Sequence, residues 1–298
     1  MPVPPGGDPS PADALGVRSA CAWVVERARD VRLGPLQQTL SLLSDRQVPR
    51  WDRRRHFTDG RDRMVAYILV LDTINFSFWG GPGGYWKLAQ GLRDAFAAGD
   101  PLWEPERLES LRREELTRWT GDLPMMDQRV QALRELGAAG GLLGHVKDSA
   151  ILTVRGLAKR LKSYADVADY ESRAIPLLKR AQIVCADLHG AGLAEFADLD
   201  ALTCFPDYKL PQVLRHFGAL EYSPALAGRI DGWQELRPGE PAEVEIRAAT
   251  VVAVERLRQE LEEGGRRLRA FEVDWMLWEV SQTLYPVRPH HRVRTIFY

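Results

Sequence analysis

The spacing of the apolar residues constrains the fold of this chain more than any other feature of its sequence. Apolar residues recur every three or four positions in most segments, whereas the strict alternation typical of a half-buried strand is scarce. Runs of Val and Ile bounded by glycines, as in parallel sheets, are missing. The clearest stripe spans 242–263, where Pro241 suits the first turn of a helix and Gly264 ends it. The sequence therefore predicts an all-α fold, a bundle of many short helices.

Glycine and proline divide the chain into its expected elements. We predict helical segments over 17–33, 36–43, 61–78, 85–97, 106–119, 124–136, 156–161, 163–169, 176–189, 199–218 (around a turn), 242–263 and 271–284. Residues 17–298 are expected to form one compact unit, and the glycines of 137–144 suggest a hinge within it. Residues 1–16, rich in proline and glycine, are expected to be a disordered or poorly packed tail.

The charge balance and the cysteines limit the kinds of partner that this chain is expected to bind. The 40 Lys and Arg residues balance 41 Asp and Glu residues, which argues against binding to a nucleic-acid backbone. The three cysteines lie far apart, so they suggest neither a disulfide framework nor a thiolate metal site, and they fit a cytoplasmic protein. We find no apolar run of about 18 residues that would span a membrane and no pattern of a signal peptide at the N-terminus. We expect a cytoplasmic monomer with no membrane partner.

Standard motifs for nucleotides, metals and nucleophilic serine are absent from the sequence. His290 and His291 form the only close histidine pair, and neighbouring residues do not share a face, so no metal site is expected. Any chemistry must therefore come from less familiar groupings.

The first such grouping lies at the end of the 61–78 segment. A planar heterocycle needs aromatic rings for its faces and polar groups for its edge, and this segment offers both beside a glycine-rich loop at 80–84. The alternative is a core helix with packed phenylalanines and a capping asparagine. The candidate binding residues here are Asp72, Asn75, Phe76, Phe78 and Trp79.

The second grouping is a turn bracketed by Pro206 and Pro211. Asp207 in this turn precedes a helix, where its carboxylate could stabilise positive charge in a transition state or orient a water. The alternative is an ordinary helix N-cap. Tyr208 and Lys209 lie in the same turn.

Two further groupings lie on predicted helices. Glu245 and Arg247 are two positions apart, so one can face a site while the other forms a structural ion pair. Asp274 precedes Trp275 and Trp278, whose spacing of three is more typical of a core than of a ligand platform.

The C-terminal stretch 290–298 is apolar and basic, so we expect it to be docked. His290 and Arg294 in this stretch are candidates for binding an anion.

These groupings, in this order, resemble the queuosine salvage protein family, the queuosine 5'-phosphate N-glycohydrolases. The matching stretches are DTINFSFW, FPDYKLPQVLRHFGALEYS, EVEIRAAT, DWMLW and HRVRTIFY, and the resemblance runs from about Val31 to Tyr298. It implies hydrolysis of the N-glycosidic bond of queuosine 5'-monophosphate, which frees queuine for tRNA modification. It also implies an all-α fold similar to helix-hairpin-helix DNA glycosylases, with no metal or organic cofactor.

The resemblance assigns roles to the candidate residues. Cleavage builds positive charge on the ribose, so a carboxylate is needed near C1'; we expect Asp207, with Glu245 as the second candidate because the similar glycosylases hold theirs at a helix N-terminus. The leaving 7-deazapurine has no N7 to protonate, so its departure requires hydrogen bonds elsewhere on the base. The remaining expected substrate contacts are Asp72, Asn75, Phe76, Phe78 and Trp79 for the base, Tyr208 and Lys209 for the sugar or phosphate, Arg247, His290 and Arg294 for the phosphate, and Asp274, Trp275 and Trp278.

Two alternatives remain at this point. A base glycosylase acting on DNA or tRNA would share the fold, although the balanced charge counts against it. A non-catalytic queuine or nucleotide carrier would need the aromatic slot but no carboxylate at C1'.

Overall fold

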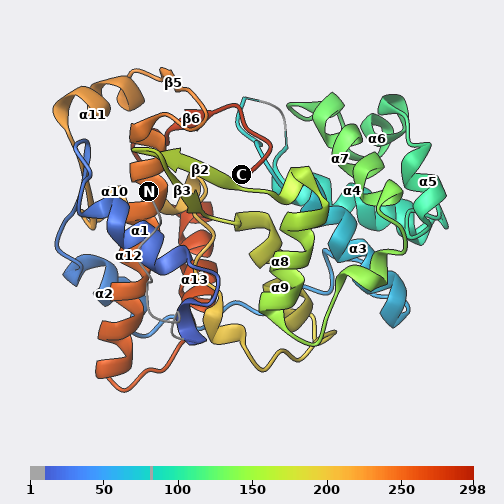
Figure 1. The fold of residues 1–298 in the computed structure, drawn as a ribbon, viewed down its shortest axis with the longest axis horizontal. Coiled ribbons are helices and arrows are strands. Elements are labelled where there is room, and N and C mark those ends of the chain that lie inside the picture. The colour runs from blue at the N-terminus through green and yellow to red at the C-terminus, as the bar shows by residue number, and fades with distance from the viewer. Residues whose placement is uncertain (1–10, 81–82) are drawn as a thin grey trace.

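The computed structural model describes residues 11–80 and 83–298, and this part of the chain is mostly helical (Figure 1). The all-α prediction is confirmed at this level. The helices are α1 (Val17–Val25), α2 (Gln37–Leu43), α3 (Arg61–Thr73), α4 (Tyr85–Ala97), α5 (Pro105–Glu109), α6 (Arg113–Thr120), α7 (Met126–Ala138), α8 (Ala150–Arg160), α9 (Lys179–Gly190), α10 (Lys209–His216), α11 (Pro224–Asp231), α12 (Pro241–Glu263) and α13 (Ala270–Thr283).

Short strands form three two-stranded ladders in the described ranges. Antiparallel pairs join β1 (Val31–Leu33) to β4 (Leu220–Tyr222) and β2 (Val167–Tyr170) to β3 (Arg173–Pro176). A parallel pair joins β5 (Glu235–Leu236) to β6 (Arg292–Val293).

Several predicted helical segments differ in the structure; the 61–78 segment, for example, is helical only to Thr73. The 17–33 segment is helical only to Val25, and its end is β1. The 163–169 segment holds a 3-10 turn and then β2, which enters a hairpin through Glu171 and Ser172, both with positive φ as a type I′ turn requires. The 106–119 segment is two helices, because a capping box at Arg112 starts α6.

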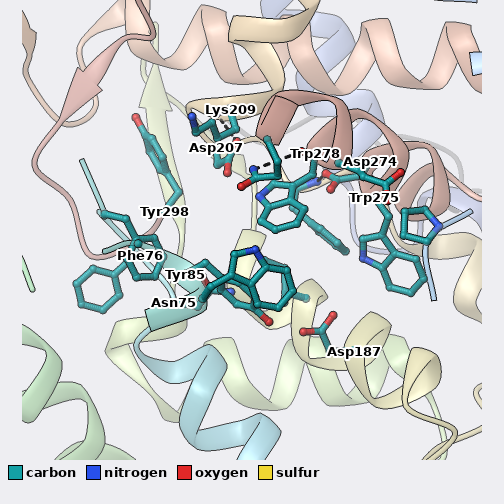
Figure 2. Close-up of a pocket in the computed structure, with 18 of the residues that line it drawn as sticks. Asn75, Phe76, Tyr85, Asp187, Asp207, Lys209, Asp274, Trp275, Trp278 and Tyr298 are labelled. Carbon is teal, nitrogen blue, oxygen red and sulfur yellow. Dashed lines mark hydrogen bonds between the residues drawn. The ribbon is translucent and has the colours of Figure 1, made fainter. Parts of the chain in front are cut away.

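Two helices are buried on nearly all sides and organise the core. Every residue of α12 from Ala242 to Val251 is buried, and α12 packs against α1, α2, α10 and α13. Every residue of α9 from Lys179 to Leu188 is buried too, between α3 and α8. In Figure 1, α8 and α9 lie between two groups of helices: α12 with α1, α2, α10 and α13 on one side, and α4–α7 on the other. The loop after α3 and the helices α4, α9, α10 and α13 line the pocket drawn in Figure 2.

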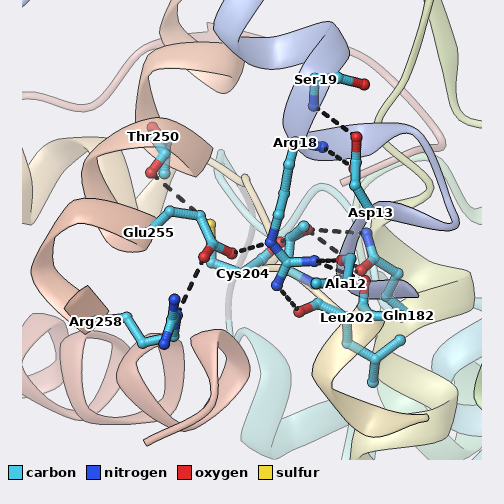
Figure 3. Close-up of polar contacts among 12 residues, drawn as sticks. Ala12, Asp13, Arg18, Ser19, Gln182, Leu202, Cys204, Thr250, Glu255 and Arg258 are labelled. Carbon is cyan, nitrogen blue, oxygen red and sulfur yellow. Dashed lines mark hydrogen bonds and ion pairs between the residues drawn. The ribbon is translucent and has the colours of Figure 1, made fainter. Parts of the chain in front are cut away.

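The segment just before α1 is tied to the core by polar contacts (Figure 3). The carboxylate of Asp13 accepts hydrogen bonds from the backbone amides of Arg18 (2.8 Å) and Ser19 (3.0 Å) and so caps α1. The Arg18 guanidinium pairs with Glu255 of α12 at 2.8 Å and donates to the Leu202 carbonyl at 2.8 Å. Residues 11–16 of the predicted tail are therefore in contact with the core, with Leu15 buried; residues 1–10 lie outside the described residues.

We expect Arg18→Met to lower the free energy of unfolding by about 2 kcal/mol, because it removes charge-assisted bonds to Glu255 and to two buried carbonyls. Urea denaturation measures this loss. Arg29→Met is the matched control, since the Arg29–Glu171 pair is exposed and contributes ~0.5 kcal/mol or less. Equal losses in the two variants would contradict the anchoring role of Arg18.

The connection at 137–144 runs from the end of α7 to a 3-10 turn at Leu142–His145, and its role as a hinge remains a prediction. No helix in the described ranges has both the length and the apolar character needed to cross a bilayer.

Candidate active site

A pocket of about 690 Å³ opens among α4, α9, α10, α13 and the loop after α3 (Figure 2). Residues from sequence segments far apart meet in its wall. Eleven of the residues expected from the sequence line it: Asn75, Phe76, Phe78, Trp79, Asp207, Tyr208, Lys209, Asp274, Trp275, Trp278 and His290.

Asp207 lies two residues before Lys209, the first residue of α10, and is half-buried. Its Oδ1 accepts the backbone amides of Lys209 (2.6 Å) and Leu210 (3.1 Å), so the carboxylate sits at the positive end of the helix. These bonds use one oxygen and leave the other available on the pocket side. The sequence left two alternatives for Asp207, a helix cap or a carboxylate in a site. In the structure Asp207 both caps α10 and lines the pocket.

One face of α9 contributes residues that sequence reasoning missed. Lys179, Ile183, Asp187 and Gly190 line the pocket at successive turns of the helix. The Lys179 side chain is buried, and burial lowers the pKa of its ammonium group while the nearby charge of Asp207 opposes the shift. The sequence held one signal for this contribution: Lys179 and Asp187, eight positions apart, are charged residues within the apolar 176–189 segment.

The pocket wall holds two nearly buried carboxylates, Asp187 and Asp274. Asp274 accepts the backbone amide of Phe205 at 2.6 Å, and burial raises the pKa of its carboxyl well above the ordinary value. Burial likewise raises the pKa of Asp187, with further contributions from Asp72 and Asp274. Both carboxylates line the pocket that Trp275 and Trp278 of α13 also line (Figure 2).

Asp72 lies behind the pocket rather than in its lining. Its side chain is fully buried, and its Oδ1 accepts the Asn75 amide at 3.4 Å. Burial raises the pKa of Asp72 to about 7, with the hydrogen bond from Asn75 opposing the shift. The geometry makes Asp72 a support for Asn75.

The rings of Phe76 and Trp79 are partly covered by arginines. The Arg129 and Arg180 guanidinium groups lie 4.5 and 5.1 Å from the Phe76 ring centroid. Arg294 lies 4.9 Å from the Trp79 ring, whose indole N–H donates to the Val293 carbonyl. Both residues reach the pocket wall, but their faces are largely occupied within the protein.

A second group of rings forms the aromatic wall of the pocket. Tyr85, Trp86 and Trp278 pack edge to face, with centroids 5.0, 5.7 and 5.8 Å apart. Sequence reasoning missed Tyr85 and Trp86, although both follow the glycine loop at the start of the predicted 85–97 helix. Residues 81–82 of that loop lie outside the described residues.

Three expected site residues lie away from the pocket. Glu245 is buried and accepts bonds from the amides of Asp30 (2.7 Å) and Val31 (3.2 Å) and from the Tyr170 hydroxyl (2.8 Å). Arg247 pairs with both oxygens of Asp166, at 2.9 and 2.6 Å. Arg294 is exposed and pairs with Glu235 at 3.1 Å. The buried contacts of Glu245 and Arg247 therefore stabilise the fold and do not face the pocket.

The C-terminal stretch is docked against the pocket. Tyr298 is buried, its ring lies 4.3 Å from the Arg247 guanidinium, and its carbonyl accepts the Ser77 amide at 2.9 Å. Tyr298 therefore contributes to the wall between Phe76 and Asp207 (Figure 2). Among residues 11–80 and 83–298, no three His, Cys, Asp or Glu residues cluster as metal ligands would.

Comparison with known proteins identifies the family. The family model described as queuosine salvage protein matches residues 55–298. The chain is 40% identical to a queuosine 5'-phosphate N-glycosylase/hydrolase of Sphaerobacter thermophilus, over 97% of this chain and 99% of that protein. Proteins of the same name from Dictyostelium discoideum and Mus musculus are 38% and 29% identical, over 78% and 95% of this chain and 78% and 99% of their own lengths. This chain therefore belongs to the queuosine salvage protein family.

Proposed function

We propose that this protein hydrolyses the N-glycosidic bond of queuosine 5'-monophosphate and releases queuine. Membership of the family supports the reaction. The observation that carries the mechanism is the carboxylate of Asp207, fixed at a helix N-terminus with one oxygen available to the pocket that holds Asn75 and the aromatic wall.

Asp207 is the proposed catalytic carboxylate. As the glycosidic bond lengthens, positive charge develops at C1' and the ring oxygen of the ribose. A carboxylate held in place by two backbone amides stabilises that charge without having to reorganise. The same oxygen can then take a proton from the attacking water.

Lys179 and Asn75 are the proposed donors to the leaving base. A 7-deazapurine has a carbon where purines carry N7, so the electron pair left by the broken bond must be stabilised at another ring edge. The Lys179 amine is buried in the pocket wall close enough to Asp207 for the carboxylate to affect its pKa. The Asn75 amide, oriented by Asp72, offers both a donor and an acceptor.

Lys209 is the proposed contact to the ribose 5'-phosphate, and His290 is the proposed contact to a ribose hydroxyl. Lys209 supplies a positive charge at the start of α10, beside Asp207. His290 has a different role, because its Nδ1 must donate to the His291 carbonyl at 2.8 Å and burial lowers its pKa to about 4. The neutral ring then presents Nε2 as an acceptor, which suits a ribose hydroxyl better than a phosphate.

We also propose that the fold is related to that of the helix-hairpin-helix DNA glycosylases, as the sequence resemblance implies. A mostly helical architecture and a carboxylate that caps a helix N-terminus support this relation. Superposition on such a glycosylase, with the two carboxylates compared, tests it.

A direct assay tests the function. Purified protein is incubated with queuosine 5'-monophosphate, with queuosine and with a queuosine-containing tRNA, and free queuine is measured by mass spectrometry. We expect base release from the mononucleotide. Release only from tRNA would favour the glycosylase alternative, and binding without release would make the protein a carrier.

We expect Lys179→Met to reduce kcat/KM about 10- to 50-fold, the effect of losing one charged hydrogen bond in the transition state. Steady-state kinetics on the mononucleotide measures it. Lys179→Arg keeps a charged donor and should recover part of the rate. A methionine variant with wild-type kinetics would remove Lys179 from the mechanism.

A further inference from the structure

Asp187 is a nearly buried carboxylate for which the mechanism above has no use. Its side chain is 8% exposed, and it lines the pocket from the third turn of α9. Within the described residues its carboxylate takes part in no hydrogen bond and no ion pair, unlike Asp274, which accepts a backbone amide. A buried carboxylate is costly without a partner, so an unpartnered one facing a ligand pocket points to a ligand.

The surroundings of Asp187 are aromatic. One turn further along α9, a Cβ on Gly190 would stand 3.0 Å from the Trp275 ring, so the glycine allows that indole to lie against the helix at this turn. Tyr85 and Trp278 face the same part of the pocket, and Figure 2 shows the Asp187 carboxylate pointing into it. Aromatic faces attract cations, so the rings and the carboxylate favour the same kind of ligand group.

The ionisable groups around Asp187 are mainly carboxyls. Asp72 on α3 and Asp274 on α13 both raise its pKa, while Lys179, two turns earlier on its own helix, lowers it less. Tyr85 on α4 also faces it, and Asp187 contributes to the raised pKa of that phenol. A positively charged ligand group at this end of the pocket would favour the ionised form of these carboxyls and pair with them, whereas the end at Lys209 suits a phosphate.

We infer that Asp187, together with the rings of Trp275 and Trp278, binds the positively charged amine of the substituent that queuine carries on its deazapurine ring. The inference rests on the proposed function, which supplies a base with a secondary amine. Lys179 and Asp187 lie eight residues apart on one face of α9, or ~12 Å at the Cα atoms. Both residues line the pocket from that face, so a base held between them can meet Lys179 at its ring edge and Asp187 at its substituent. Asp187 is then the residue that selects queuosine over nucleotides without this amine.

Calorimetric binding of two free bases to the full chain tests the inference. Queuine carries the amine within a substituent that also holds a hydroxylated cyclopentene ring, and 7-deazaguanine lacks this whole substituent. The effect of Asp187→Asn on the two affinities, rather than the preference of the wild-type protein, therefore reports on the amine. We expect wild-type protein to bind queuine at least 30-fold more tightly. We expect Asp187→Asn to weaken queuine binding about 10- to 30-fold and to change 7-deazaguanine binding less than about 3-fold.

Folding and specificity controls accompany this variant. Asp62→Asn, an exposed carboxylate on α3, should leave both affinities unchanged. Removing an unpartnered buried charge should not lower the melting temperature, and Asp187→Ala gives a second variant for the same comparison.

The outcomes separate the two proposals. If Asp187→Asn weakens both bases equally, or neither, Asp187 does not bind the amine and the inference falls. If Asp187→Asn selectively weakens queuine binding yet the wild-type protein releases no queuine from the mononucleotide, the proposed function falls and the amine site stands. If it hydrolyses the mononucleotide but does not distinguish the two bases, the function stands and the amine site falls.

Discussion

Asp207→Asn should lower kcat on queuosine 5'-monophosphate by about 10²-fold or more and leave the fold intact. The asparagine oxygen can still accept the amides of Lys209 and Leu210, so the start of α10 keeps its cap. What the variant loses is the negative charge that faces the developing positive charge on the ribose. Stopped-assay measurement of released queuine gives kcat, and thermal unfolding gives the control for folding.

Glu245→Gln is the matched comparison, because Glu245 is the other carboxylate that the resemblance proposed for catalysis. Its two oxygens accept bonds from Asp30, Val31 and Tyr170, all outside the pocket lining. We expect this variant to retain kcat within about 3-fold and to be less stable, since a glutamine presents one acceptor where two are used. A near-normal rate in Asp207→Asn together with an inactive Glu245→Gln would move the catalytic role to Glu245.

Much of the pocket wall could be predicted from sequence because its residue types are unusual for a core. Asn75, Asp207 and Asp274 each stand beside aromatic residues or in a proline-bracketed turn, where a purely structural segment has little need of them. Their order along the chain also carried the family resemblance. The structure places all three in one lining, together with Lys209 and His290.

The α9 contribution could not be predicted by the same reasoning. Charged residues on a helix with apolar periodicity are usually assigned to the solvent face, and only tertiary packing reveals that Lys179 and Asp187 are buried. Phe76 and Trp79 illustrate the converse. Their aromatic character was visible, but the arginines that cover their faces come from distant segments, including Arg180 and Arg294.

The spacing of apolar residues could not predict the short strands or the roles of the residues at the start of α12, because these also depend on tertiary packing. A strand of two to four residues such as β1 is too short to display alternation, and its partner β4 lies almost 190 positions away. Residues 242–251 of α12 are all buried, so the spacing of Glu245 and Arg247 cannot show which of the two faces a site. In the structure both Glu245 and Arg247 make buried contacts within the protein.

Arg247→Met is expected to lower the free energy of unfolding by about 3–5 kcal/mol, the cost of breaking a buried ion pair from one side. Asp166 would keep its burial and lose its guanidinium partner, and Glu243 would lose the nearest positive charge, 3.6 Å away. Burial alone would lower the pKa of Arg247, but Asp166 and Glu243 hold it above its ordinary value, which reflects how strongly the charged form is stabilised.

Urea unfolding of Arg247→Met measures this loss, and Arg294→Met is its control, since the exposed pair with Glu235 contributes ~0.5 kcal/mol or less. The comparison also decides between the two roles that the sequence left open for Arg247. A phosphate-binding arginine would raise KM for the mononucleotide and leave stability nearly unchanged. A structural arginine lowers stability first, and because it also donates to the Pro206 carbonyl at 3.0 Å, it disturbs kcat only through the turn that holds Asp207. We expect the second pattern, and a stable variant with a raised KM would contradict it.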